Sequence, residues 1–199
     1  MEFWNENVIE SSWKVLQELR KEFDFILIGG WASWLITKTL KSRDVDIVVD
    51  YQELEKIRLR YDLKHNSNLR KYEIRIRGID VDIYVPHYSK IGIDLSKIKI
   101  VKIQGFKVVC PEQLLIMKQF VWKKRTGEKK KKDEIDIFAL VTVVDFDKYK
   151  EFLKQENKMS YIDDLISVVK NFKDYKYLNL TPRKFKLLKE KILKELKRL

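Results

Sequence analysis

The stretch GGWASWLITKTLKSRDVDIVVD, residues 29–50, holds the chain's only Gly-Gly pair and two aspartates that flank a single valine. It follows the apolar run FDFILI, which predicts a buried strand ending in a glycine turn. We expect a helix over 31–40 and a second strand over 45–49. Side chains alternate across a strand, so Asp44 and Asp46 project from one face, and Val45, Ile47 and Val49 from the other.

A second copy of this pattern lies in GIDVDIYVP, residues 78–86, where Asp80 and Asp82 share one face. If the two strands are neighbours, three or four carboxylates converge. Two like charges about 4 Å apart repel by about 4 kcal/mol at an effective dielectric near 20, so the cluster needs a cation. Oxygen ligands without His or Cys suit Mg²⁺ or Mn²⁺, and two such ions held by aspartates promote nucleotidyl displacement. The turn at Gly29 and Gly30, backed by a helix N-terminus, is suited to binding phosphate.

Composition narrows the class of protein. The chain has 199 residues, of which 45% are hydrophobic and 36% are charged. A chain of this length and composition can bury one hydrophobic core, or one core and a small second one. A net charge of +12 favours polyanionic partners. One cysteine and two histidines exclude an internal disulfide and a zinc site with several such ligands. We expect a cytoplasmic protein, because the start does not resemble a signal peptide and no apolar run is long enough to span a membrane. The abundance of Lys, Glu and Ile is typical of a thermophile.

The two parts of the chain differ in their patterns. Strand and helix signals alternate up to residue 110, and helix signals dominate from Pro111 onward. We therefore expect an α+β (α/β) fold, with a small mixed β-sheet domain over 1–110 and a C-terminal helical domain over 111–199. The other expected elements are helices over 8–22, 51–62, 111–124, 133–143, 147–156, 160–172 and from 182, a strand over 68–77, and a hairpin over 99–109 that turns at Gln104-Gly105. The charged stretch 123–134 is expected to be a mobile loop.

Taken in order, the strand, the Gly-Gly turn, the helix, Asp-x-Asp and a third aspartate resemble the DNA-polymerase-β-type nucleotidyltransferase superfamily. Residues 108–140 are similar to the second signature of AbiEii-type and related small nucleotidyltransferases. In that signature a Pro-Glu-x-Leu helix start is followed by a lysine, a basic stretch and Lys-Asp-x-x-Asp. The matching positions are Pro111, Glu112, Leu114, Lys118, Lys132, Asp133 and Asp136.

This resemblance implies a role for each matching residue. Gly29 and Gly30 would form the phosphate loop, Asp44 and Asp46 would bind both metal ions, and Asp82 would be the third ligand and the general base. Asp80 stays open as the alternative to Asp82. Lys118 and Lys132 would contact the nucleotide. Many members carry a serine after the glycine, where this chain has Trp31; nearby Ser33, which does not align with that serine, is a further candidate for nucleotide binding.

The resemblance implies an enzyme that transfers a nucleoside monophosphate from an NTP donor, with Mg²⁺ or Mn²⁺ as cofactor. The basic surplus favours RNA as the acceptor, and toxins of this group suggest a tRNA end and an antitoxin-like protein partner. A protein hydroxyl or a small molecule is the less favoured acceptor. A nucleotide-binding module without turnover, and a basic nucleic-acid-binding protein with structural aspartates, remain as alternatives.

Overall fold

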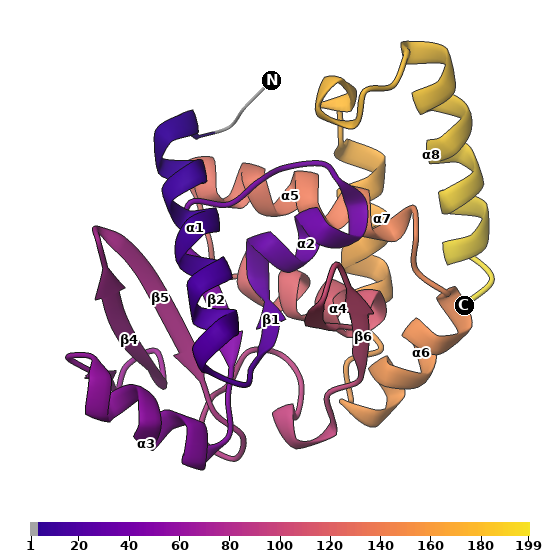
Figure 1. Ribbon diagram of the computed structural model, residues 1–199. Helices are drawn as coiled ribbons and strands as arrows, with labels where there is room; N and C mark the ends of the chain where they lie inside the picture. The colour runs from indigo at the N-terminus through magenta and orange to yellow at the C-terminus, as the bar shows by residue number, and fades with distance from the viewer. Residues whose placement is uncertain (1–3) are drawn as a thin grey trace. The chain divides into compact units, whose positions relative to one another are not determined.

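The computed structural model describes residues 4–199, which form an α+β protein with a seven-stranded mixed sheet (Figure 1). The chain divides into two compact units. Residues 4–90 and 94–110 form the sheet unit, and residues 91–93 and 111–199 form the helical unit. None of the described helices is both long and apolar enough to cross a membrane.

The sheet unit contains every strand and the first three helices. Its elements are α1 (Glu6–Glu22), β1 (Ile26–Ile28), α2 (Gly29–Thr37), β2 (Val45–Val48), α3 (Tyr51–Arg60), β3 (Lys64–Asn66), β4 (Lys71–Ile76), β5 (Ile79–Tyr84), a 3-10 turn η1 (Leu95–Lys97), β6 (Ile100–Ile103) and β7 (Phe106–Val109). The strand order is β3-β4-β5-β2-β1-β7-β6. β2 and β5 are parallel neighbours, as are β1 and β7, whereas the other pairs are antiparallel.

The strands around the Asp-x-Asp pattern form as the alternation predicts. Val45, Ile47, Val81 and Ile83 are fully buried on one face of the sheet, whereas the aspartates between them are partly exposed on the other. Burying one such side chain contributes about 1.5–3 kcal/mol. The apolar face therefore fixes the register that positions the polar face.

Helices α1 and α2 are joined through aromatic side chains. The Trp31 ring lies 4.9 Å from that of Trp13 and 5.5 Å from that of Trp34, measured between centroids. Trp31 is 1% exposed, and its indole Nε1 donates a hydrogen bond of 2.8 Å to the Ser12 hydroxyl. Packing of this kind stabilises both helices, because a short helix gains most of its stability from tertiary contacts.

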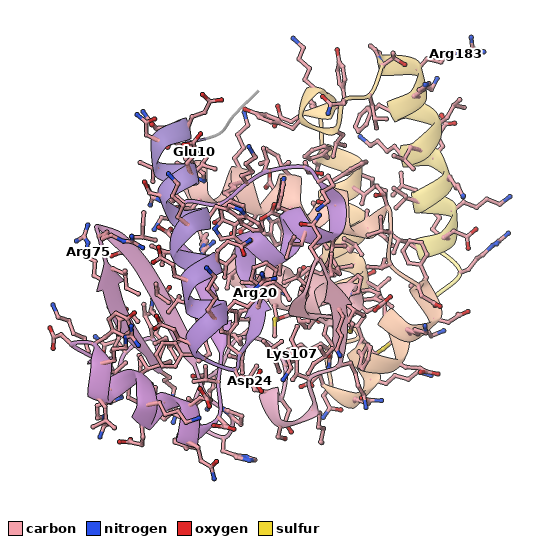
Figure 2. All side chains as sticks on the ribbon, in the orientation of Figure 1. Glu10, Arg20, Asp24, Arg75, Lys107 and Arg183 are labelled. Atoms are coloured by element: carbon pink, nitrogen blue, oxygen red, sulfur yellow. The ribbon has the colours of Figure 1, made fainter. Side chains whose placement is uncertain are left out.

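The expected hairpin is confirmed in β6 and β7. Gln104 and Gly105 have φ of +52° and +78° at the turn, the left-handed conformation that a tight two-residue turn requires. The Gln104 carbonyl accepts a hydrogen bond of 2.9 Å from Arg20 of α1. Near the start of β7, the Lys107 ammonium lies 2.6 Å from a carboxylate oxygen of Asp24, and Figure 2 labels both side chains.

Two expectations in this unit were wrong in detail. The strand expected over 68–77 forms only over Lys71–Ile76, as β4, because residues 67–70 form a turn, and the short strand β3 before that turn was not predicted. The Asn66 side chain accepts a hydrogen bond from the Leu69 N–H at 3.0 Å, and Arg70 adopts a φ of +51°. Side chains such as Asn that bond the backbone two or three residues on favour turns over strands. Helix α2 also ends three residues early, where Lys38 takes a left-handed conformation.

The helical unit contains the remaining helices. They are α4 (Pro111–Trp122), α5 (Gly127–Val141), α6 (Phe146–Gln155), α7 (Tyr161–Asn171), a 3-10 turn η2 (Tyr175–Leu178) and α8 (Pro182–Leu196). The expected loop over 123–134 was wrong from Gly127 onward, since α5 begins there and carries the lysine run on its first turns. Lys and Glu are good helix formers, so a dense run of charges does not by itself end a helix.

Candidate functional site

The site is built on one row of residues that crosses four strands. Asp46 of β2 lies opposite Asp82 of β5 on parallel strands, and Asp82 lies opposite Glu73 of β4. On the other side of Asp46 the partner is Ile28, the last residue of β1, directly before Gly29. Facing residues on adjacent strands lie about 5 Å apart, so three acidic side chains from separate parts of the sequence become neighbours.

Asp44 extends the acidic row beyond the start of β2. Its side chain is 43% exposed, and its Oδ2 lies 3.3 Å from Nε of the adjacent Arg43. It precedes Asp46 by two residues, which places it on the same face. Asp80 is similarly exposed, at 61%, and forms an ion pair of 3.4 Å with Arg75, the residue opposite it on β4.

Lys71, two residues before Glu73 on β4, supplies the positive charge nearest to this row. The ammonium of Lys71 lies 2.6 Å from Oδ2 of Asp82 and 3.1 Å from Oε1 of Glu73, and its side chain is only 11% exposed. Asn66 donates a further hydrogen bond of 2.9 Å to the same oxygen of Glu73. Lys71 therefore neutralises part of the charge that the acidic row concentrates.

Burial and charge act in opposite directions on these groups. Burial raises the pKa of Asp82, the charges of Glu73 and Asp44 add to this effect, and the Lys71 ammonium reduces it without cancelling it. For Lys71, burial acts to lower the pKa, but the hydrogen bonds and charges of Asp82 and Glu73 outweigh burial and raise it. The hydrogen bond from Asn66, followed by the contribution of Lys71, lowers the pKa of Glu73.

The glycine turn and the carboxylates are in direct contact. Gly29 has a φ of +68° and is the first residue of α2. A Cβ atom built on it would lie 2.5 Å from Cγ of Asp46 and would overlap the carboxylate. Helix α2 has no side-chain N-cap hydrogen bond and no acidic residue in its first turn. The Asp46 carboxylate thus lies at a helix N-terminus, where backbone N–H groups favour negative charge.

The residue that follows the glycine pair, Trp31, belongs to the hydrophobic core. Trp31 fills the interior between α1 and α2 and offers no hydroxyl to a phosphate. Ser33 is 1% exposed, and its hydroxyl has no hydrogen-bond partner among residues 4–199. A contact between Ser33 and a nucleotide would require α2 to move, so the described position of Ser33 does not favour the predicted role.

Lys118 and Lys132, predicted to bind nucleotide, lie in the helical unit, where both contact one carboxylate. Oδ2 of Asp136 is 2.7 Å from the Lys118 ammonium and 3.1 Å from that of Lys132. Asp136 is 1% exposed and both lysines are below 10%. Burial acts to raise the pKa of Asp136, but the two ammonium charges outweigh it and hold the pKa below its usual range. Either lysine would have to leave Asp136 to reach a nucleotide.

Asp133 completes this buried group. Its Oδ2 lies 2.8 Å from Nη1 of Arg125, and its Oδ1 lies 3.6 Å from the Lys118 ammonium. The Lys-Asp-x-x-Asp pattern therefore forms a buried ionic cluster on α5, with Lys118 contributed by α4.

Whether a divalent metal ion fits this site depends on the ligand atoms that the side chains offer. Throughout the described part of the chain, no three His, Cys, Asp or Glu side chains are gathered tightly enough to hold a metal ion as they stand. Asp44, Asp46 and Asp82 nevertheless offer only carboxylate oxygens from one face of the sheet, which is the chemistry that Mg²⁺ prefers. One of the two carboxylate oxygens of Asp82, Oδ2, is paired with the Lys71 ammonium at 2.6 Å.

Lys71 and Glu73 were not among the predicted site residues. The signal was present, because Lys-x-Glu in KYEIRI repeats the two-residue spacing of the Asp-x-Asp patterns. What the sequence could not supply is the antiparallel register of β4 with β5, which sets Glu73 opposite Asp82.

Replacing Lys71 with methionine is expected to lower the free energy of unfolding by about 2 kcal/mol, because hydrogen bonds to charged groups contribute about 1.5–3 kcal/mol each. Urea denaturation of the two proteins in metal-free buffer measures the difference.

Lys107→Met is the matched control for this measurement. It removes the Lys107–Asp24 ion pair, whose side chains are 43% and 65% exposed, and such pairs contribute about 0–1 kcal/mol (Figure 2). Equal losses for the two variants would contradict the neutralising role given to Lys71.

Comparison with known proteins shows the fold of the chain. No protein-family model matches it, and no curated protein sequence matches it. Among solved structures, JHP933 from Helicobacter pylori matches 96% of this chain and 94% of its own, with a TM-score of 0.53 and 14% identity. A provisionally assigned nucleotidyltransferase from H. pylori matches 98% of both chains, with a TM-score of 0.52 and 14% identity.

A third similar structure is the Megavirus polyadenylate synthase, at 19% identity and a TM-score of 0.45. The match covers 68% of this chain but spans only 30% of the length of that enzyme. The likeness to the two H. pylori proteins extends over both units of the chain, and at 14% identity it establishes a shared fold.

Proposed function

We propose that the chain is a nucleotidyltransferase, which transfers a nucleoside monophosphate from an NTP to a hydroxyl group and releases pyrophosphate. The observation that carries this proposal is the register of Asp46 with Asp82 on adjacent parallel strands, next to the start of α2. The fold shared with an H. pylori protein provisionally assigned to this activity supports it.

The acidic row provides the side chains for the reaction. In the transfer, the acceptor oxygen forms a bond to the α-phosphorus, and the bond from that phosphorus to the departing pyrophosphate breaks. Asp82 is the candidate base that takes the acceptor proton. Its alignment with Asp46 favours it over Asp80, which is more exposed and paired with Arg75. The N–H groups at Gly29 and Gly30 are the candidate donors to the phosphates.

Asp44, Asp46 and Asp82 would hold Mg²⁺ or Mn²⁺, which when bound neutralises the phosphate charge and lowers the pKa of the attacking hydroxyl. Lys71 would release Asp82 at that point and keep Glu73 as its partner, which lies 3.1 Å away. The acidic row would thus stay neutralised both before and after the ion binds.

The net positive charge of the chain favours RNA as the acceptor, because the chain has 42 Lys and Arg residues but only 30 Asp and Glu residues. Within that class a tRNA end, and with it a toxin-like role regulated by an antitoxin-like protein, is the finer form of the proposal. The alternative of a basic nucleic-acid-binding protein without turnover differs in one measurable respect, since such a protein would not bind Mg-NTP.

Thermal unfolding with each of the four NTPs, with and without Mg²⁺, tests the proposal without requiring the acceptor to be known. A ligand at about 100 times its Kd stabilises the folded protein by about 2.7 kcal/mol. We expect a Mg²⁺-dependent rise in Tm with at least one NTP, and its loss in Asp46→Asn.

Asp80→Asn is the matched control, because it removes an exposed carboxylate from the same face of the same sheet. It should retain the rise in Tm. If no NTP stabilises the wild-type protein, or if Asp46→Asn is stabilised as much as wild type, the nucleotidyltransferase assignment is wrong.

A further inference from the structure

Positive charge is concentrated in the C-terminal part of the chain. Residues 111–199 contain 23 Lys and Arg against 14 Asp and Glu, and so carry most of the net charge of +12. Helix α8 and the two residues just past it hold seven exposed cations. The basic face of α8 consists of Arg183, Lys184, Lys186, Lys191, Lys194, Lys197 and Arg198.

These cations are not neutralised within the protein. In the described residues, 4–199, Arg198 is the only member of the basic face with an ion pair, at 3.0 Å from Glu195. Glu190 is the one exposed acid on the helix. Figure 2 shows Arg183 extending away from α8. Such a surface repels itself and is stabilised by a polyanion.

The helix is also held in place. The Lys189 ammonium donates hydrogen bonds of 2.7 Å and 3.1 Å to the carbonyl oxygens of Lys170 and Phe172, at the end of α7. Phe185, Ile192 and Leu196 are buried on the opposite side of α8. The cations are therefore presented from a fixed helix about 22 Å long, at 1.5 Å per residue.

The burial of the apolar side of α8 indicates which kind of polyanion its basic face would bind. An amphipathic helix that binds a membrane inserts its apolar face among the lipids, and here that face already lies in the core of the helical unit. What remains outside is a row of charge with Leu187 as its one large exposed apolar side chain. A row of cations with a single large exposed apolar side chain fits a phosphodiester backbone.

We propose that the basic face of α8 binds the phosphate backbone of RNA, independently of base sequence. As the docking surface for an RNA acceptor, this role rests on the proposed function. Binding itself requires neither NTP nor a divalent ion. Its affinity depends on displaced counterions, so it falls steeply as salt concentration rises.

The test uses the full chain and fluorescently labelled poly-U RNA, with binding followed by anisotropy in metal-free buffer between about 50 and about 200 mM salt. The variant carries Lys184→Gln, Lys191→Gln and Lys194→Gln together. Because this variant lacks three ammonium groups that would each neutralise a phosphate, the slope of log K against log salt should flatten by about 2. Its affinity for poly-U at about 0.1 M salt should fall by about 100-fold.

The matched control carries Lys148→Gln, Lys150→Gln and Lys154→Gln, which remove the same charge from α6 of the same unit. It should retain wild-type affinity and salt slope. Equal losses in both variants, no binding of poly-U by wild type, or binding to phosphatidylserine vesicles that exceeds binding to RNA would each overturn the assignment of α8.

The Mg-NTP thermal shift separates this inference from the proposed function. The α8 variant should lose RNA affinity and keep the full rise in Tm with Mg-NTP. An RNA-binding wild type without any Mg-NTP shift would leave the α8 surface supported and the transferase assignment wrong.

Discussion

Gly29→Ala is expected to lower the free energy of unfolding by about 3 kcal/mol or more and to abolish Mg-NTP binding. Two effects combine at this residue. A side chain at a φ of +68° costs about 1–3 kcal/mol in backbone strain. The new Cβ would also lie 2.5 Å from Cγ of Asp46, and overpacking of this kind adds about 1–3 kcal/mol. Urea denaturation measures the sum.

Gly78→Ala separates the two effects. Gly78 has a φ of +83°, but a Cβ there would meet nothing within 4 Å, so only the strain remains. The double variant Gly29→Ala/Asp46→Ala removes the overlapping carboxylate and should recover part of the overlap cost. If Gly29→Ala costs no more than Gly78→Ala, the contact between the glycine turn and Asp46 is not tight enough to shape the site.

Asp136→Asn is expected to destabilise the protein by about 3–5 kcal/mol at neutral pH, because it leaves the buried ammonium groups of Lys118 and Lys132 without their shared counter-charge. The two ammonium groups hold the folded-state pKa of Asp136 below its unfolded-state value, so its contribution is fully present above the unfolded-state pKa. That contribution is lost as pH falls through the lowered folded-state pKa. The difference between wild type and variant should therefore shrink in acid.

Asp164→Asn is the control for this prediction. Asp164 pairs with Lys123 at 2.7 Å in the same unit, but the two side chains are 26% and 41% exposed. Pairs of this exposure contribute about 0–1 kcal/mol. Urea midpoints for the three proteins at neutral pH and below about pH 4 give the comparison. A loss for Asp136→Asn no larger than for Asp164→Asn would show that the buried cluster is not stabilising.

Local patterns predicted the elements of the sheet unit well where burial is one-sided. The alternation in DVDIVV and DVDIYV predicts two strands with their acids on one face, and the structure pairs them directly as β2 and β5. The hairpin at Gln104-Gly105 follows from its turn residues alone. In each case the residues that determine the strand or the turn lie within it or within a few positions of it.

Features that depend on contacts between distant parts of the chain could not be predicted from the sequence. The neutralising role of Lys71 depends on the register between β4 and β5, and the burial of Ser33 depends on how α2 packs. The lysine run of α5 was misjudged for a related reason. Charge density is typical of a mobile loop, but the buried side of α5, with Asp133 and Asp136 among apolar residues, keeps this segment helical.

The short strand β1 has a consequence for how the chain folds. Leu27 pairs with Ile47 on one side and with Val108 on the other, so the centre of the sheet joins residues about 80 positions apart. Closing a loop of that length costs conformational entropy before any contact compensates, and such topologies fold slowly. We expect the β6–β7 hairpin to form early and to dock against β1 late. On the ribosome, the sheet could close only once residue 108 and its neighbours had emerged, and helix-rich sequence would still be under synthesis at that moment.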